Sequence, residues 1–338
     1  MVNSMNNNVY MIAEAGVNHN GDLNIAKELI NMAKYAGADA VKFQTYIAEE
    51  VMGKDTPKAD YQKQNTGSEE TQYDMVKKLE LSFDDFLILH QYCLDIKIDF
   101  LTTPFDFKSI DFVESNFKMK YWKIPSGEIT NLPYLKKIGR ISEEILLSTG
   151  MCNMDEVEDA WDILKSSGNS KITLLHCTSE YPAPLEDVNL KAIETLRHHF
   201  NAPVGYSDHT EGIVVPIAAV ALGATIIEKH FTLDKTMEGP DHIASIDPYE
   251  LKEMVDAIRD VETALGDGIK KVRPSELENR KLARKSIVAK KDIHAGELFS
   301  EDNITTKRPG TGLSAMCWDD IIGHISKKDV RKGDLIEL

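Results

Sequence analysis

The chain of 338 residues has no apolar run that approaches the roughly 20 residues a membrane-spanning helix requires. Its polar start, MVNSMNNN, also lacks the apolar segment of a signal peptide, so we expect a cytoplasmic protein with no membrane partner. Its four cysteines lie far apart and show no C-x-x-C spacing. We expect them to be reduced thiols and not zinc or redox sites.

Positive charge is also scarce, with 39 Lys and Arg residues against 55 Asp and Glu residues and a formal net charge of −16. Nucleic-acid affinity depends on Lys and Arg neutralising phosphates, so this balance argues against a nucleic-acid partner. The chain has no G-x-x-x-x-G-K-(S/T) motif, which excludes a P-loop. An anionic substrate would therefore have to be met by a few local positive charges.

The first 265 residues alternate short β-branched runs with longer amphipathic stretches. Eight runs are expected to form strands, at 9–15, 40–45, 99–104, 121–126, 144–149, 172–177, 203–208 and 225–231. The helical patterns include 23–35, 84–97, 154–166, 190–200 and 248–265. Eight such units favour an α/β fold of the (β/α)8 TIM-barrel type over an open doubly wound sheet.

A long loop, 46–70, follows the second expected strand and contains most of the polar segment DTPKADYQKQNTGSEETQ at 55–72. Loops of this length in compact domains are usually functional or disordered, and the sequence leaves both open. After the second strand it would lie on the face where barrel enzymes build their sites.

The pattern changes after residue 266, where short strands are broken by glycines and charged turns. The segment KDIHAGEL at 291–298 is echoed by KDVRKGDL at 328–335, which indicates a small pseudo-symmetric β module. We therefore expect a barrel domain over 1–266, an exposed linker over 267–283 and a small module over 284–338.

Polar residues collect at the ends of the expected strands, where barrel enzymes carry their chemistry. Burying an unpaired ammonium is costly, so Lys42 and Lys123 pointing into a barrel suggest a bound anion. Hydroxyls from four strands could donate hydrogen bonds to the same anion, and a phosphate would suit them. These are Thr103, Ser126, Ser148 and Ser207. Alternatively, such hydroxyls cap the helices that follow.

Two histidines end the seventh and eighth strands, which are neighbours in a closed barrel. His209 and His230 could share a divalent cation such as Mn²⁺, Fe²⁺, Co²⁺ or Zn²⁺, with positions left for substrate. Glu14 lies in the turn AEAGVNHNG, where a carboxylate could transfer protons near such a metal. Its alternative role is that of a cap or an ion-pair partner.

Together these residues resemble the sialic acid synthase family, close to its bacterial N-acetylneuraminate and legionaminate synthases. The family condenses phosphoenolpyruvate with an N-acetylated hexosamine to give nonulosonic acids. The matching stretches are AEAGVNHNG, VKFQT, TTPFD, WKIPSGEITNLPYL, LSTGM, HCTSEYPAP, GYSDHT, EKHFTLD, GPDH and TTKRPGTG. The resemblance implies a TIM barrel followed by an antifreeze-protein-like (SAF, β-clip) domain. It also implies a domain-swapped homodimer in which that domain covers the partner's site.

The resemblance also implies roles for single residues. It assigns His209 and His230 to a metal, usually Mn²⁺, and Glu14 to acid/base catalysis. The positions that would bind phosphoenolpyruvate are Lys42, Thr103, Lys123, Ser126, Ser148 and Ser207. The positions near the sugar are Gln44, Asn65, Glu128, Tyr181 and Asp241, together with Arg308 from the other protomer. Ser179 stands where some relatives have Asn, which removes an amide contact to the sugar.

Several functions remain open within and outside this resemblance. The acceptor would be unphosphorylated N-acetylmannosamine, giving N-acetylneuraminate, or 2,4-diacetamido-2,4,6-trideoxymannose, giving legionaminate. The enzyme alternatives are an N-acylneuraminate-9-phosphate synthase and another phosphoenolpyruvate-aldose synthase of the octulosonate or heptulosonate kind. Outside enzymes, the antifreeze-like module would suit a carbohydrate- or ice-binding protein, against which the complete set of barrel-site residues argues.

Overall fold

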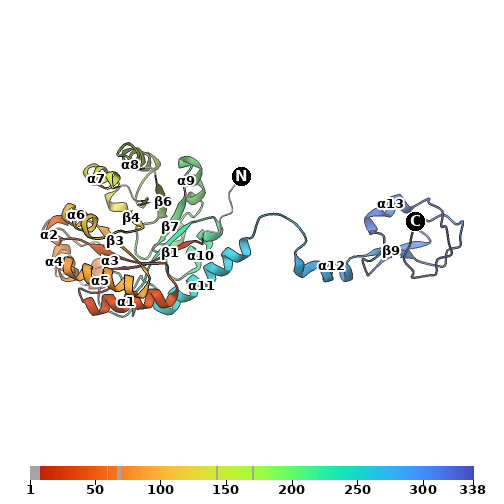
Figure 1. Cartoon of the computed structure of the whole chain (residues 1–338), viewed down its shortest axis with the longest axis horizontal. Coiled ribbons are helices and arrows are strands. Elements are labelled where there is room, and N and C mark those ends of the chain that lie inside the picture. The colour runs from red at the N-terminus through yellow and green to blue at the C-terminus, as the bar shows by residue number, and fades with distance from the viewer. Residues whose placement is uncertain (1–7, 59, 67–69, 142–143, 170) are drawn as a thin grey trace. The chain divides into compact units, whose positions relative to one another are not determined.

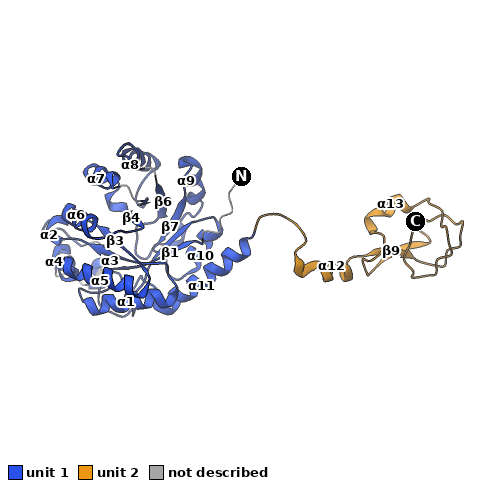
Figure 2. Ribbon diagram, in the orientation of Figure 1, with its two compact units in different colours: residues 1–266 blue, residues 267–338 orange. Residues whose placement is uncertain are grey.

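The structure is a computed structural model that describes residues 8–58, 60–66, 70–141, 144–169 and 171–338. The chain divides into two compact units, residues 1–266 and 267–338, which are coloured separately in Figure 2. Each unit has its own hydrophobic core, and the two are described separately below.

The first unit is a nearly closed barrel of eight parallel strands, in the order β3-β2-β1-β8-β7-β6-β5-β4. The strands are β1 (Tyr10–Gly16), β2 (Ala40–Thr45), β3 (Asp99–Pro104), β4 (Tyr121–Ile124), β5 (Glu144–Ser148), β6 (Ile172–Cys177), β7 (Val204–Asp208) and β8 (Ile226–His230). The first strand pairs with both the second and the last, which brings the two ends of the unit together. The predicted (β/α)8 barrel is confirmed.

Helices surround the strands, as Figure 1 shows. They are α1 (Leu23–Ala36), α5 (Phe83–Ile96), α6 (Phe107–Asn116), α7 (Leu132–Arg140), α8 (Met154–Ser166), α9 (Ala192–Phe200), α10 (Val214–Ala221) and α11 (Pro248–Leu265), with short 3-10 turns η1 (Ser126–Glu128) and η2 (Leu185–Asp187). Capping residues determine where these helices begin and end. In α1, the Asp22 side chain accepts from the first backbone N–H groups, and Gly37 ends the helix at φ 85°, where glycine has no Cβ to clash.

The stretch after β2, which the sequence left open as a functional or a disordered loop, contains three short helices among its described residues. It holds α2 (Ala48–Val51), α3 (Asp60–Thr66) and α4 (Gln72–Leu79). Thr71 and Asp74 form a capping box that starts α4. The ammonium of Lys58 is buried and lies 3.0 Å from a carboxylate oxygen of Glu70, which ties the segment together. The polar composition hid these short helices because their stability comes from caps and tertiary contacts.

The second unit contains η3 (Pro274–Glu276), α12 (Leu277–Ala283), β9 (Ser286–Ala289), β10 (Ile304–Lys307), η4 (Ala315–Cys317) and α13 (Trp318–Ile321). The predicted connector 267–283 is therefore partly helical, since ELENRKLA has strong helix formers. The two repeats cap each other. Asp292 Oδ1 accepts from Lys332 N at 2.7 Å, and Asp329 Oδ1 accepts from Ala295 N at 2.9 Å. This exchange explains why both copies keep Lys-Asp before the glycine turn.

Within the described parts of the chain, no helix is long and apolar enough to cross a membrane.

Candidate active site

Strand register brings the predicted catalytic side chains to one end of the barrel. Glu14 on β1 is paired in register with Lys42 on β2 and with His230 on β8. Ser207 on β7 is paired with Glu228 on β8 in the same way. Alternate side chains of a strand point to the same face, so Glu228 and His230 both enter the barrel.

Two lysines and two glutamates form a buried charge cluster at this end. Lys42 Nζ lies 2.6 Å from Glu14 Oε2 and 3.6 Å from Glu228 Oε2. Lys123 Nζ lies 2.6 Å from Glu228 Oε1. All four side chains are at most 6% exposed. The expectation of unpaired lysines is therefore wrong, because each ammonium already has a carboxylate partner.

The surroundings of the cluster shift the pKa values of its two glutamates in opposite directions. Burial raises the pKa of Glu14 to about 7, although the neighbouring Lys42 opposes the shift. Burial also acts to raise the pKa of Glu228, but the charges of Lys123 and Lys42 outweigh it and lower that pKa. The Lys123 pKa is lowered by burial, which its partner carboxylate only partly offsets. Carboxylates with separated pKa values are typical of acid and base roles.

Hydroxyl groups line the same cluster. Thr103 Oγ1 accepts from Lys42 at 3.1 Å, and Ser207 Oγ donates to Glu228 Oε1 at 2.9 Å. Ser126 Oγ accepts from Gly150 N at 2.9 Å, and Ser126 lies in η1, just past its strand. The Ser148 Oγ is buried without a partner among the described residues. Thr103 and Ser207 therefore contact the charge cluster directly, while Ser126 follows β4 and Ser148 ends β5.

His209 and His230 face each other beside this cluster, with ring centroids 5.5 Å apart, and Tyr181 packs on both rings. His209 Nδ1 donates to the Thr178 carbonyl oxygen at 2.7 Å, which leaves the lone pair on Nε2. The Nδ1 of His230 is buried without a described partner. Gly16, next to this site, has φ 54°, in the left-handed region that favours glycine.

The two histidines fit an open metal site. In the described ranges, no group of three or more His, Cys, Asp or Glu side chains is placed to hold a metal ion. A cation here would thus take two imidazole ligands from the protein and keep its other positions for water or substrate, as catalytic centres do. The buried lone pair on His209 and the unpartnered nitrogen on His230 suit that role.

The residues predicted to contact the sugar lie on several different elements of the structure. Gln44 and Glu128 are half-buried, and Glu128 accepts from Asn131 Nδ2 at 2.6 Å. Asp241 is buried, which raises its pKa to about 6. Asn65 Nδ2 donates to the Pro240 carbonyl oxygen at 2.7 Å, directly beside Asp241, so α3 is tied to the connection that follows β8.

Arg308 belongs to the second unit, where it is exposed and its Nε donates to the Ala283 carbonyl oxygen at 2.9 Å. An arginine held by one backbone contact keeps the other guanidinium N–H groups for a ligand.

Three residues of the site were missed by reasoning from the sequence alone. Glu228 was not among the predicted site residues, yet it contacts three of the predicted anion ligands, Lys42, Lys123 and Ser207. Glu228 lies two residues before His230 on the same strand, so both side chains point to the same face. This spacing could have identified Glu228 as a site residue. Asp208 and Lys229 form a buried ion pair at 2.6 Å, next to both histidines in the chain. Their pairing follows from the register of β7 and β8, which the sequence does not show.

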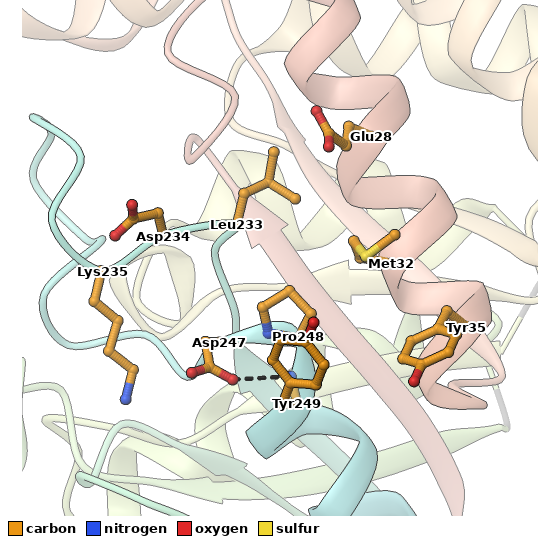
Figure 3. Close-up of a pocket in the computed structure, with 9 residues that line it drawn as sticks. All are labelled: Glu28, Met32, Tyr35, Leu233, Asp234, Lys235, Asp247, Pro248 and Tyr249. Atoms are coloured by element: carbon orange, nitrogen blue, oxygen red, sulfur yellow. Dashed lines mark hydrogen bonds between the residues drawn. The ribbon is translucent and has the colours of Figure 1, made fainter.

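A separate pocket of about 720 Å³ lies between α1 and the connection from β8 to α11. Figure 3 shows its lining, including Tyr35 and Tyr249, and the bond that Asp247 accepts from Tyr249 N. None of the predicted site residues is among those lining it. Its polar groups are occupied as helix caps and surface ion pairs, so the catalytic chemistry is not assigned to it.

Comparison with known proteins places these features in context. Residues 29–270 match the NeuB family, and residues 284–337 match the SAF domain. The chain is 53% identical to the N,N'-diacetyllegionaminic acid synthase of Campylobacter jejuni, over 96% of this chain and 98% of that protein. It is 51% identical to the enzyme of the same name from Legionella pneumophila, over 93% and 89%.

A solved structure is similar as well. The N-acetylneuraminic acid synthetase of Leptospira borgpetersenii, in complex with citrate, superimposes with a TM-score of 0.72 and 37% identity. The match covers 81% of this chain and 90% of that one.

Proposed function

This chain belongs to the NeuB family, and from that premise we propose that it condenses phosphoenolpyruvate with an N-acetylated hexosamine and releases phosphate. The resemblance read from the sequence motifs is thereby confirmed at the level of the family. The observation that carries the proposal is the buried cluster of two lysines and two glutamates beside a histidine pair. Neither an ice-binding surface nor a simple sugar-binding domain requires such a cluster.

We assign the anion to the lysines and their hydroxyls. Lys42 and Lys123 supply positive charge, and Thr103, Ser126, Ser148 and Ser207 supply hydrogen bonds to the phosphate and carboxylate of phosphoenolpyruvate. Burial acts to lower the pKa of Lys42, but Glu14 and Glu228 outweigh it and raise that pKa, which favours a charged ammonium before the substrate arrives. Glu228 thus holds the lysines ready for the incoming anion.

We assign a divalent cation, most often Mn²⁺ in this role, to His209 and His230. When bound there, it would supply Lewis-acid polarisation of the sugar aldehyde. Side chains of the protein would supply the other groups that the reaction requires, for anion binding and proton transfer.

We propose the following course for the reaction. The enol carbon of phosphoenolpyruvate forms a bond to the aldehyde carbon, and water adds to the carbon that bears the phosphate ester. Glu14, 2.6 Å from the lysine that binds the anion, accepts a proton from that water and returns it to the former aldehyde oxygen, which becomes a hydroxyl. The tetrahedral intermediate breaks its C–O bond to phosphate as its new hydroxyl becomes the ketone and gives its proton to the departing phosphate. Lys42 and Lys123 stabilise that anion. The carbon skeletons are joined and one phosphate leaves.

For the acceptor we favour 2,4-diacetamido-2,4,6-trideoxymannose, which would give N,N'-diacetyllegionaminate. The two relatives that bear this activity in their names support the choice, at 53% and 51% identity. Gln44, Asn65, Glu128, Tyr181 and Asp241 are assigned to the sugar. N-acetylmannosamine is the second acceptor, and a phosphorylated hexosamine is the alternative that the family also contains.

A panel of acceptors tests this proposal. Phosphate release from phosphoenolpyruvate with Mn²⁺ is measured with the diacetamido sugar, N-acetylmannosamine and its 6-phosphate. We expect kcat/KM to be highest with the diacetamido sugar, by at least about tenfold, the scale of one well-matched hydrogen-bonded group. Highest activity with the 6-phosphate would contradict the proposal that the acceptor is unphosphorylated. No release with any of the three would contradict the proposed reaction.

The pH dependence of kcat/KM provides a second prediction. Glu14 must be ionised to accept a proton, and burial raises its pKa to about 7. The rate constant is therefore expected to fall about tenfold per pH unit below pH 7 and to level off above it. Rates from pH 5.5 to 8.5 at saturating metal check this. A profile that falls as the pH rises through 7 would show that the protonated acid is required instead.

We also propose that the chain is a domain-swapped homodimer. The barrel domain would be 1–266, the linker 267–283 and the SAF domain 284–338, whose Arg308 would reach the partner's sugar. Cytoplasmic location, expected from the sequence, stays a prediction.

Mixing two inactive variants tests the exchange of Arg308. E14Q lacks the proton acceptor, and R308A lacks the arginine, but a heterodimer would contain one site with both. We expect activity near one quarter of the wild-type value after subunit exchange, because half the dimers would have one complete site. No recovery despite exchange, measured with differently tagged chains, would place Arg308 in its own chain's site.

A further inference from the structure

A buried ion pair lies behind the two histidines, on the opposite face of the strands. Ser207 and Glu228 contact each other inside the barrel, so their neighbours Asp208 and Lys229 point outward. Lys229 Nζ lies 2.6 Å from Asp208 Oδ2, with the two side chains 1% and 0% exposed. Neither residue takes part in the reaction proposed above.

This pair fixes the backbone on both sides of His209. Asp208 precedes His209, and its Oδ1 accepts from the backbone N–H of Thr210 at 3.1 Å and from the Thr210 hydroxyl at 2.9 Å. The Lys229 ammonium also donates to the Thr210 carbonyl oxygen. Thus a side chain from the residue just before His230 holds the turn that carries His209.

The energetics favour a positioning role over a stabilising one. Removing two charges from water costs several kcal/mol per ion, so a buried pair often stabilises a fold no more than apolar residues of the same size. The pair instead fixes the positions of β7 and β8 relative to each other. It joins the two strands where Asp208 lies opposite Lys229. The Thr178 carbonyl orients the His209 ring from the other side.

We propose that the Asp208–Lys229 ion pair is a positioning device that sets His209 against His230 as a two-histidine metal site. The inference rests on the proposed function, because it presupposes that these histidines bind a divalent cation. Outer groups that orient metal ligands typically change metal affinity 10- to 100-fold when they are replaced.

The test is Mn²⁺ binding to the full-length protein, measured by calorimetry and by the paramagnetic resonance signal of free Mn²⁺. The variant D208N/K229M removes both charges, and its new amide oxygen can still accept from Thr210. We expect it to stay folded and to bind Mn²⁺ 10- to 100-fold more weakly than the wild type. The matched control D39N/R259M removes an ion pair of 3.0 Å elsewhere in the barrel unit and should bind Mn²⁺ like the wild type.

The possible results distinguish failure of the positioning role from failure of the proposed metal site. If the wild type binds no Mn²⁺, the metal assignment itself fails. If the wild type binds and folded D208N/K229M binds within twofold of it, only the positioning role fails. If the double variant does not fold, T210V decides, because it removes only the hydroxyl bond to Asp208. A severalfold weaker affinity in T210V supports the inference, and an unchanged affinity overturns it.

Discussion

Replacement of Glu14 by Gln is expected to reduce kcat by about 10³-fold, within the range that a positioned acid or base contributes. The amide keeps the shape of the side chain but cannot accept the proton of the attacking water. Lys42 keeps Glu228 as a partner at 3.6 Å, so phosphoenolpyruvate should still bind. Steady-state kinetics and calorimetric titration of phosphoenolpyruvate measure the two effects separately.

A matched control makes this result specific. Glu262 lies at the other end of the barrel, where it contacts Val9 N and Arg259. Its replacement by Gln should leave kcat within about twofold, as expected for a side chain remote from the chemistry. If E14Q turned over at a near-normal rate, Glu14 would not be the proton acceptor.

Replacement of His230 by Gln is expected to have an effect of similar size, through loss of the metal. Lewis-acid polarisation is worth several kcal/mol, so the rate should fall by about 10³-fold. The Mn²⁺ affinity should fall in the same variant, measured directly on the protein. Chelation of the wild type should cause the same loss, and addition of Mn²⁺ should restore only the wild type.

His199 provides the control for this variant. It lies on the surface of α9, close to Glu158 and half-exposed, so H199Q should keep both Mn²⁺ affinity and rate. Wild-type activity that persists after exhaustive chelation, with no metal detected in the protein, would contradict a metal-dependent step.

The barrel could be predicted because its strands are short, continuous β-branched runs. Five of the eight expected strands, at 40–45, 99–104, 144–149, 172–177 and 203–208, differ from the observed ones by at most one residue at one end. Parallel strands buried on both sides keep this hydrophobic signal. The helices of the stretch after β2 could not be predicted in the same way, because caps such as Thr71 with Asp74 and the pair Lys58–Glu70 stabilise them.

The site could be predicted as a set of residues but not as a set of contacts. Position at strand ends identified Lys42 and Lys123, since side chains there converge in a barrel. Their partner Glu228 could not be identified as such, because pairing depends on the register of β8 against β7. The sequence suggested free ammonium groups awaiting an anion, whereas in the barrel each ammonium is paired with a carboxylate.

The central claim is that a carbon–oxygen bond of phosphoenolpyruvate breaks after water adds to its carbon. Phosphoenolpyruvate carrying ¹⁸O in the bridging position tests this directly when it reacts with the preferred acceptor. We predict that the ¹⁸O appears in the released phosphate, as mass spectrometry or ³¹P resonance would show, and that the sugar product lacks it. Bridging ¹⁸O retained in the sugar acid would mean phosphorus–oxygen cleavage and would contradict the proposed reaction.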